Sequence, residues 1–367
     1  MSSAAARGSE PKRIACIDQL RGYAIFGMLL VNASDLFFKP VKATLEGSGL
    51  HGFFEACLYQ LSHHRTTFSY ADTIAPLFVF VVGMGMRLSW LRRRDRLAPW
   101  DIRKGMIKRY SLLVLIGFAI YAGWYWDALM DIGLAGLLAV GLIDKKPRTR
   151  VMAALGFVVA FQLIHMFTSY GTWSIYGKFS LENPDYVPIL VRLVPLHDQL
   201  FGCTLNGGPL GPMGWVMMLL LGSYAYDLLA ERNSKKFIAG CLGWGIGLCA
   251  VAFALHVEWP GVKEAWPFSA RYMTAPFPLW SSGLCFLQLL AFYLICDKLH
   301  IKIPTFQSVG MNPLAIYIAH SLFLDVAEGF APERLSLAMG LVGFAIFWAA
   351  FSGAAYYMLR KKIYVKL

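Results

Sequence analysis

The stretch HHRTTFSYADTIAPLFVFVVGMGM, residues 63–86, decides the fold class, because it leads from two histidines and an aspartate into a long apolar run. A run of this length predicts a membrane-spanning helix. Ionisable groups are costly in lipid, so Asp72 at the start of the run indicates a function. The structural alternative is that the histidines lie in a solvated loop and Asp72 caps the helix, with Pro76 in its first turns.

The composition of the whole chain extends this prediction to a polytopic membrane protein. Of 367 residues, 57% are hydrophobic and only 15% are charged, whereas soluble domains typically carry about 25% charged residues. We predict an all-α membrane helix bundle with about ten transmembrane helices. Their approximate limits are 19–37, 70–90, 108–124, 127–143, 150–168, 211–230, 237–256, 277–297, 307–325 and 335–358. The third and fourth spans can merge, because only a short turn around residues 124–126 separates them.

The basic residues predict the orientation of the bundle. With both termini in the cytoplasm, about 26 of the 34 Lys and Arg residues lie on or near the cytoplasmic side, as the positive-inside rule requires. The same rule explains most of the net charge of +12, which therefore does not indicate a nucleic-acid partner.

The chain is predicted to form one membrane-embedded unit. Residues 1–17 are expected to be a disordered cytoplasmic N-terminus, and residues 18–367 a single transmembrane domain whose first span is an uncleaved anchor. Two exterior loops, 39–69 and 169–210, are expected to cover an outward-facing cavity, although ordinary surface loops are the alternative. The seven cysteines show no metal-binding spacing, so no metal site is inferred; Cys57 and Cys203 both lie outside and can pair.

Polar side chains inside two spans outline a path through the bilayer. Asn32 lies eleven residues beyond Arg21, which is about 17 Å along a helix and past the membrane midplane. In the ninth span, His320 lies eight residues, or about 12 Å, beyond Asn312. Each of these residues can instead serve only to link or kink helices. Together with Asp72, however, they argue against a purely structural protein.

A basic cluster marks the cytoplasmic side between the second and third spans. It includes Arg93, Arg94 and Arg109, which can hold a phosphorylated donor through charge-assisted hydrogen bonds. Topology alone is the alternative explanation. No phosphate-binding loop of the GxxxxGK[ST] or GxGxxG type and no Gly-x-Ser-x-Gly elbow occurs, so nucleotide hydrolysis, dinucleotide binding and serine-hydrolase chemistry are not expected.

Several segments resemble those of a known family. RGYAIFGMLLVN (21–32), ADTIAPLFVFVVG (71–83) and GMNPLAIYIAH (310–320) look like the signature segments of the heparan-alpha-glucosaminide N-acetyltransferase family and its bacterial relatives. GPLGPMGWVMMLLLGSYAYD (208–227) and FPLWSSGLCFLQLLAFYLICD (277–297) look similar to its later helices. The resemblance covers most of the chain in order.

The resemblance implies transfer of an acetyl group from cytosolic acetyl-CoA to a sugar amine or hydroxyl across the membrane. It implies that Asn32 and a histidine are the catalytic pair, and His63 and His64 both fit, with His51 as a remote third choice. The histidine would act as a base or carry the acetyl group, the amide would stabilise an oxyanion, and Asp72 would orient the histidine or the acceptor. The residues expected to contact the acetyl-CoA donor are Arg21, Arg93, Arg94, Arg109, Asn312 and His320.

Two other classes of function remain open on the sequence. A transporter or flippase for a small solute or lipid-linked sugar can use the same polar path, but the chain has no evident internal repeat. A non-catalytic membrane scaffold is less consistent with the exterior histidines and buried amides. The expected partners of the favoured acetyltransferase are acetyl-CoA, an extracytoplasmic glycan or amino sugar and the bilayer. The resemblance also implies a homodimer and, for a bacterial source, the inner membrane.

Overall fold

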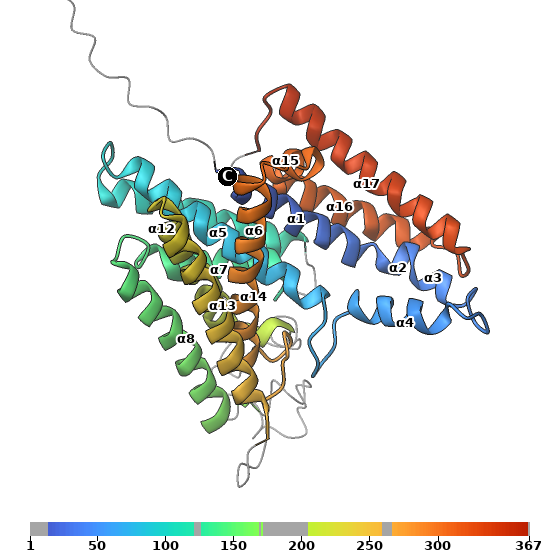
Figure 1. Ribbon diagram of the computed structural model, residues 1–367, viewed down its shortest axis with the longest axis horizontal. Helices are drawn as coiled ribbons and strands as arrows, with labels where there is room; N and C mark the ends of the chain where they lie inside the picture. The colour runs from blue at the N-terminus through green and yellow to red at the C-terminus, as the bar shows by residue number, and fades with distance from the viewer. Residues whose placement is uncertain (1–13, 121–125, 169, 172–204, 259–265, 366–367) are drawn as a thin grey trace, which may run out of the picture.

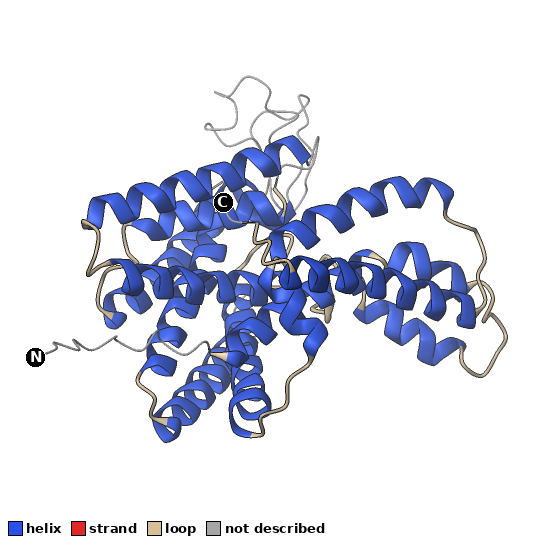
Figure 2. Cartoon of the chain, turned by 90° about the horizontal axis from the view of Figure 1, so that it is seen from above, coloured by secondary structure: helices blue, strands red, loops and turns tan. Residues whose placement is uncertain are grey.

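The computed structural model describes the chain except for residues 1–13, 121–125, 169, 172–204, 259–265 and 366–367. Every regular element of the described residues is a helix (Figure 2), which confirms the predicted all-α class. Most of the predicted disordered segment 1–17 lies outside the described residues. Residues 15–17 already belong to the first helix, so the helix begins earlier than predicted.

The helices occur at all ten predicted positions. They are α1 (Ala15–Asn32), α2 (Ser34–Phe37), α3 (Lys39–Lys42), α4 (His51–Gln60), α5 (Ala71–Arg93), α6 (Pro99–Ile120), α7 (Ala128–Val140), α8 (Pro147–Phe167), α12 (Pro212–Ala230), α13 (Ser234–His256), α14 (Pro276–Phe292), α15 (Pro304–Met311), α16 (Pro313–Ala327) and α17 (Leu337–Arg360). A π-helical turn, η3 (Tyr293–Lys298), extends α14, and short 3-10 turns precede α12 (η2, Leu205–Leu210) and follow α16 (η4, Glu328–Phe330).

Fewer of these helices than predicted are both long and apolar enough to cross a membrane. In the described residues six pass this test, and eight pass if two bent pairs each count as one span. The predicted third and fourth spans are the exceptions: α6 carries charged residues through its first half, and α7 has only 13 residues. The two helices pack against each other.

The two bent pairs break at the asparagines that the sequence singled out. The axis turns by 44° between α1 and α2–α3, directly after Asn32. It turns by 91° between α15 and α16, at Asn312 and Pro313. Pro313 has no backbone N–H to continue the helix, so the predicted kink is present and is sharper than a simple bend.

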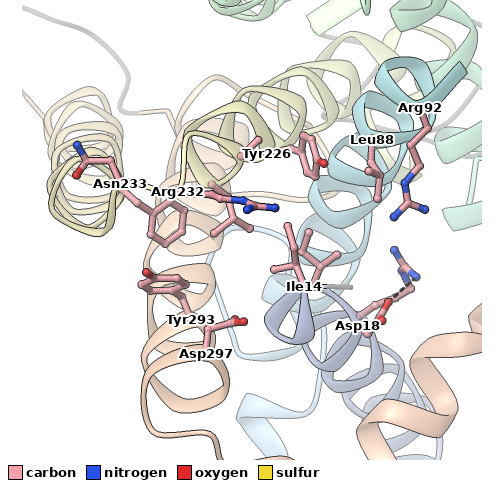
Figure 3. A pocket seen from close by; sticks show the side chains of 14 residues that line it. Ile14, Asp18, Leu88, Arg92, Tyr226, Arg232, Asn233, Tyr293 and Asp297 are labelled. Atoms are coloured by element: carbon pink, nitrogen blue, oxygen red, sulfur yellow. Dashed lines mark ion pairs between the residues drawn. The ribbon is translucent and has the colours of Figure 1, made fainter. Parts of the chain in front are cut away.

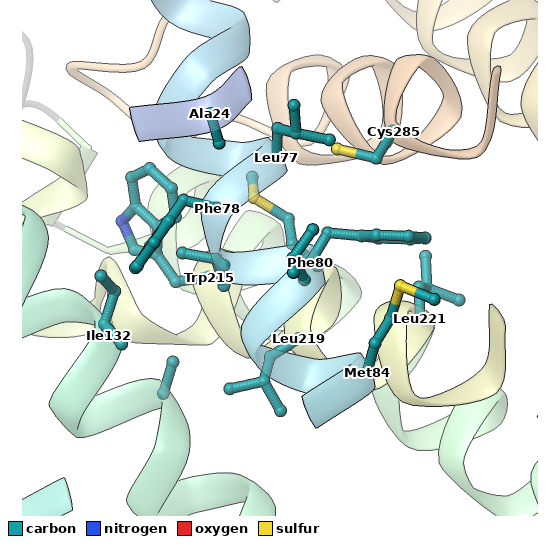
Figure 4. Close-up of a cluster of buried hydrophobic side chains, with 14 of the residues drawn as sticks. Ala24, Leu77, Phe78, Phe80, Met84, Ile132, Trp215, Leu219, Leu221 and Cys285 are labelled. Carbon is teal, nitrogen blue, oxygen red and sulfur yellow. The ribbon is translucent and has the colours of Figure 1, made fainter. Parts of the chain in front are cut away.

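The centre of the bundle is the contact between α5 and α12. An added Cβ on Gly83 would lie 1.9 Å from the carbonyl oxygen of Leu219, and one on Gly222 would lie 1.9 Å from that of Phe80. Two helices can approach this closely only through glycine at both crossings. Large apolar side chains then pack around the crossing, including Leu77, Phe80, Met84, Trp215 and Leu219 (Figure 4).

The remaining helices surround this centre in two groups (Figure 1). α15, α16 and α17 lie beside α1–α3, whereas α8, α13 and α14 pack with α12 on the other side. α5 contacts α1, α12 and α14 and so joins the groups.

Buried ion pairs hold the helix ends together at the end of the bundle that carries most Lys and Arg residues, which we call the basic end. Arg87 of α5 donates to Asp227 of α12 (Nε to Oδ1, 2.8 Å) and to the carbonyl of Ile143 (2.7 Å). Arg150 of α8 is fully buried and donates to the other Asp227 oxygen and to Ser223. One carboxylate thus fixes three helices relative to one another.

Candidate functional site

His63 and Asp72 form a hydrogen-bonded pair at the end of the bundle opposite the basic end. The loop between α4 and α5 places Nδ1 of His63 2.7 Å from Oδ1 of Asp72. The second carboxylate oxygen accepts hydrogen bonds from the backbone N–H (3.0 Å) and the hydroxyl (3.1 Å) of Ser69. Asp72 therefore holds both the turn before α5 and the histidine, although it does not cap the helix as the structural alternative expected, because it lies inside the first turn of α5.

The environment of His63 prepares its ring for proton transfer. Its side chain is 60% exposed, whereas that of Asp72 is 1% exposed. Burial lowers the pKa of His63, but the hydrogen bond and charge of Asp72, together with the charge of Asp127, more than offset this and raise it above its usual value. Because Nδ1 donates to the carboxylate, Nε2 is the nitrogen that can accept a proton when the ring is neutral.

The adjacent histidine has a different environment. Nε2 of His64 lies 2.9 Å from the carbonyl oxygen of Tyr59, and its ring stacks on that of Tyr59 with centroids 3.8 Å apart. His64 thus binds the last turn of α4, and only His63 lines the neighbouring cavity.

That cavity has a volume of about 790 Å³ and is strongly acidic. We call it the acidic cavity. It is lined by Asn32, His63, Tyr317 and Ser321 among others, and its charged residues are Asp35, Lys39, Asp127, Asp325 and Glu328. Lys39 is paired with Asp35 at 2.7 Å. Carboxylates thus outnumber cations around this space.

Asn32 and His320 meet beside the acidic cavity. The amide Nδ2 of Asn32 lies 3.0 Å from Nε2 of His320, and Nδ1 of His320 lies 3.2 Å from the carbonyl oxygen of Ile316. His320 must donate to that carbonyl, so it accepts from the amide of Asn32. The sequence placed both residues on one polar path, and the structure brings them into direct contact. His320 itself is fully buried.

Three of the predicted donor-binding arginines line a second cavity, which starts at the basic end and reaches into the bundle. This deep cavity has a volume of about 460 Å³. Arg21, Arg93 and Arg109 line it together with Arg92, and much of the rest of its wall is apolar, from α5, α6 and α7, from the α15–α16 junction and from the C-terminal segment. Arg21 also lies 3.6 Å from Asp18, the pairing expected for residues three apart on a helix.

A surface cavity of about 700 Å³ adjoins the deep cavity and shares Arg21, Leu88 and Arg92 with it. Arg92 and Arg232 extend into this surface cavity from opposite sides (Figure 3). Arginine side chains recognise phosphate groups well, because their planar forks can donate two parallel hydrogen bonds. The basic end therefore offers two connected spaces suited to an anionic ligand.

The deep and acidic cavities nearly meet inside the bundle. On α16, Leu314 lines the deep cavity and Tyr317 lines the acidic one, so the lining residues of the two cavities lie about one helical turn, or about 5 Å, apart along this helix. At the start of α7, Leu129 likewise lines the deep cavity, and Asp127, the residue before the helix, lines the acidic one. A group at the inner end of one cavity is thus close to the other.

Three predicted donor-binding residues line neither cavity: Arg94, Asn312 and His320, which is buried and bound to Asn32. Arg94 is exposed and lies 3.6 Å from Asp95. Asn312 is fully buried, donates to the carbonyl of Ile363 and accepts from the N–H of Val365, each at 3.0 Å. Asn312 therefore fixes the C-terminal segment, whose Val365 lines the deep cavity. No group of three or more potential metal ligands occurs in the described part of the chain.

Sequence reasoning missed other cavity residues. Asp127 directly precedes the apolar helix α7, and its side chain accepts from the N–H of Ala128. Like Asp72, it is an ionisable group at the start of an apolar run, and this position could have marked it as a candidate. The sequence gave no reason to select Arg232 or Tyr317 as cavity residues, because a basic residue at a helix end and a tyrosine in an apolar helix are both common. Cys203 and most of the predicted 169–210 loop lie outside the described residues, and Cys57 is a free thiol.

Comparison with known proteins supports the resemblance. The family model described as heparan-alpha-glucosaminide N-acetyltransferase, catalytic, matches residues 13–191. This range contains two of the three signature segments, 21–32 and 71–83. The protein YxaH of Bacillus subtilis is 26% identical over 224 residues, which cover 53% of this chain and 51% of YxaH. YeiB of Escherichia coli is 24% identical over 281 residues, covering 68% of this chain and 66% of YeiB. The chain thus spans about half to two thirds of these relatives, which are both named as uncharacterized.

Proposed function

We propose that this chain, whose residues 13–191 match the heparan-alpha-glucosaminide N-acetyltransferase family model, transfers an acetyl group from acetyl-CoA to an amino sugar across a membrane. The coarser assignment, a multi-pass membrane acyltransferase, follows from the family and from the apolar helices. The observation that carries the finer proposal is the pair of cavities, one ringed by arginines and one by His63 and carboxylates, that nearly meet inside the bundle.

The basic end fits the donor. The positive-inside rule assigns this end to the cytoplasm, where acetyl-CoA is available. Its phosphates would bind Arg21, Arg92, Arg93 and Arg109, while the pantetheine arm would follow the apolar wall of the deep cavity. The thioester would then lie at the inner end of this cavity, within about one helical turn of the acidic cavity.

The charge of the acidic cavity favours an amine as the acceptor. A protonated amine is attracted by Asp127, Asp325 and Glu328, whereas a sulfated or carboxylated glycan is repelled by them. The amine must lose a proton to become a nucleophile, and His63 is the base that lines this space. A hydroxyl acceptor would use the same base.

The residues suggest a direct transfer. His63 Nε2 takes one proton from the bound ammonium and releases it to solvent, and then takes a second proton as the neutral nitrogen attacks the thioester carbonyl. The carbon–nitrogen bond forms, the carbon–sulfur bond breaks, and the leaving CoA thiolate takes up the second proton from the protonated imidazole. Asp72 stabilises the protonated imidazole. One amide hydrogen of Asn32 is bound by His320, so the second can donate to the developing oxyanion.

A reconstituted assay tests this function. The purified protein in liposomes receives acetyl-CoA on one side and methyl glucosaminide on the other, and free CoA and acetylated sugar are measured. We expect both products in equal amounts, and a loss of about 100-fold or more in acetylated sugar with His63→Ala. Thermal stability should also rise with acetyl-CoA in the wild type and in His63→Ala, since a ligand of the folded state stabilises it.

The same assay separates the alternatives. Movement of unmodified sugar without release of CoA would support a transporter instead. No transfer and no stabilisation by acetyl-CoA would overturn the proposed function. Because both relatives are bacterial, we propose the bacterial inner membrane as the location; a homodimer stays a prediction.

A further inference from the structure

An apolar groove of about 370 Å³ lies beside the acidic cavity. The amphipathic region α3–α4 forms one side of it and the first turns of α17, through Leu337 and Leu341, form another. All of its lining residues are leucine, phenylalanine or cysteine. The groove is therefore suited to hydrocarbon and not to a sugar or a charged group.

The groove and the acidic cavity lie side by side. Leu61 lines both spaces. At two further places consecutive residues line different spaces: Leu30 lines the groove and Val31 the cavity, and Phe38 lines the groove and Lys39 the cavity. Three separate segments thus lie along the boundary of the two spaces, which makes the spaces close enough for the two ends of one amphiphilic ligand.

The surroundings place this border at the level of a membrane surface. On α4, Phe53 is 73% exposed, although the same helix carries Glu55, which binds Lys42 at 2.5 Å. An exposed aromatic beside paired charges is typical of a helix lying in the membrane interface. The groove then opens toward acyl chains and the acidic cavity toward water.

We propose that the acceptor is an amphiphile, a sugar amine carried on a hydrocarbon chain, whose chain lies in the groove while its sugar occupies the acidic cavity. This inference rests on the proposed function and names its substrate class. The uncharged groove is complementary to the hydrocarbon chain of such a molecule, and the cavity with five charged side chains is complementary to its sugar amine.

A chain-length series tests the proposal. In liposomes, acetylation of dodecyl glucosaminide is compared with that of methyl glucosaminide for the wild type and for Leu341→Trp, which fills the groove. Val342→Trp is the matched control, because Val342 is the next residue, is exposed to 57% against 53% for Leu341, and does not line the groove. Leu45→Trp fills the groove from another side.

We expect kcat/KM to be at least tenfold higher for the dodecyl acceptor in the wild type and in Val342→Trp. Both filling variants should lose this preference while they acetylate methyl glucosaminide at the wild-type rate, which also shows that they are folded. A preference that survives both filling variants would mean that the chain only concentrates the acceptor in the bilayer, and would overturn the proposal. Transfer without any chain preference overturns the proposal alone, whereas no transfer to either acceptor overturns the proposed function with it.

Discussion

Replacing Asp72 with asparagine tests the assignment of His63 as the base. The side chain keeps its size, and its carbonyl can still accept from Nδ1 of His63, 2.7 Å away, but the charge is lost. Burial lowers the pKa of His63, and the hydrogen bond and charge of Asp72 with the charge of Asp127 reverse this effect. The pKa of His63 should therefore fall in Asp72→Asn.

The size of the fall follows from the geometry. An opposite charge within hydrogen-bonding distance shifts a pKa by about 1–3 units. The His63 side chain is 60% exposed, so solvent screens the interaction and the fall is smaller than for a fully buried pair. The base works only when neutral, so the acid limb of kcat/KM in the wild type should lie above about pH 6.5 and should move to lower pH in Asp72→Asn. The limiting rate should fall roughly 100-fold, because the base is weaker and less well oriented.

The assay is acetyl transfer to methyl glucosaminide from about pH 5 to 9. Glu55→Gln is the control: it removes a carboxylate at the same end of the bundle, but Glu55 binds Lys42 and does not line the acidic cavity. Its acid limb should stay in place. An unchanged acid limb in Asp72→Asn, with activity high enough to measure, would show that His63 is not the titrating base.

Three further predictions test other parts of the structure. His64→Ala should keep most of the transfer activity, because His64 binds Tyr59, whereas His63→Ala should lose about 100-fold or more; equal losses would contradict the separation of the two histidines. Arg93→Ala should raise the KM for acetyl-CoA by about tenfold or more with little change in kcat, and Arg94→Ala, outside the deep cavity, should change neither. Asp227→Asn should lower the free energy of unfolding by about 3–5 kcal/mol, measured by thermal denaturation, because it leaves two arginines without their counter-charge; an unchanged melting temperature would exclude the predicted stabilisation.

Much of the fold could be predicted because the length and hydrophobicity of a local segment determine whether it forms a membrane helix. Apolar runs of sufficient length predicted ten helical positions that are all helical in the structure, and Pro313 predicted the break before α16. The segment 39–69, predicted to be a loop, instead contains the short helices α3 and α4, which are too short to be recognised as spans. The number of spans was less well predicted. Whether α6 and α7 cross the membrane depends on how a charged half-helix and a 13-residue helix are covered by their neighbours, and this is a property of packing.

By itself, the sequence determined the all-α membrane class, the end of the bundle that carries the positive charge, and the candidate residues Asn32, His63, Asp72 and the arginines, because each follows from the cost of polar groups in lipid. Only the tertiary structure shows that His63, and not His64, pairs with Asp72 and that Asn32 contacts His320. It also shows that Asn312 binds the C-terminal segment. These choices depend on side-chain directions and on contacts between residues nearly 300 positions apart, which local pattern and helix depth do not define. The two cavities and the apolar groove arise in the same way, from where several helices together leave space.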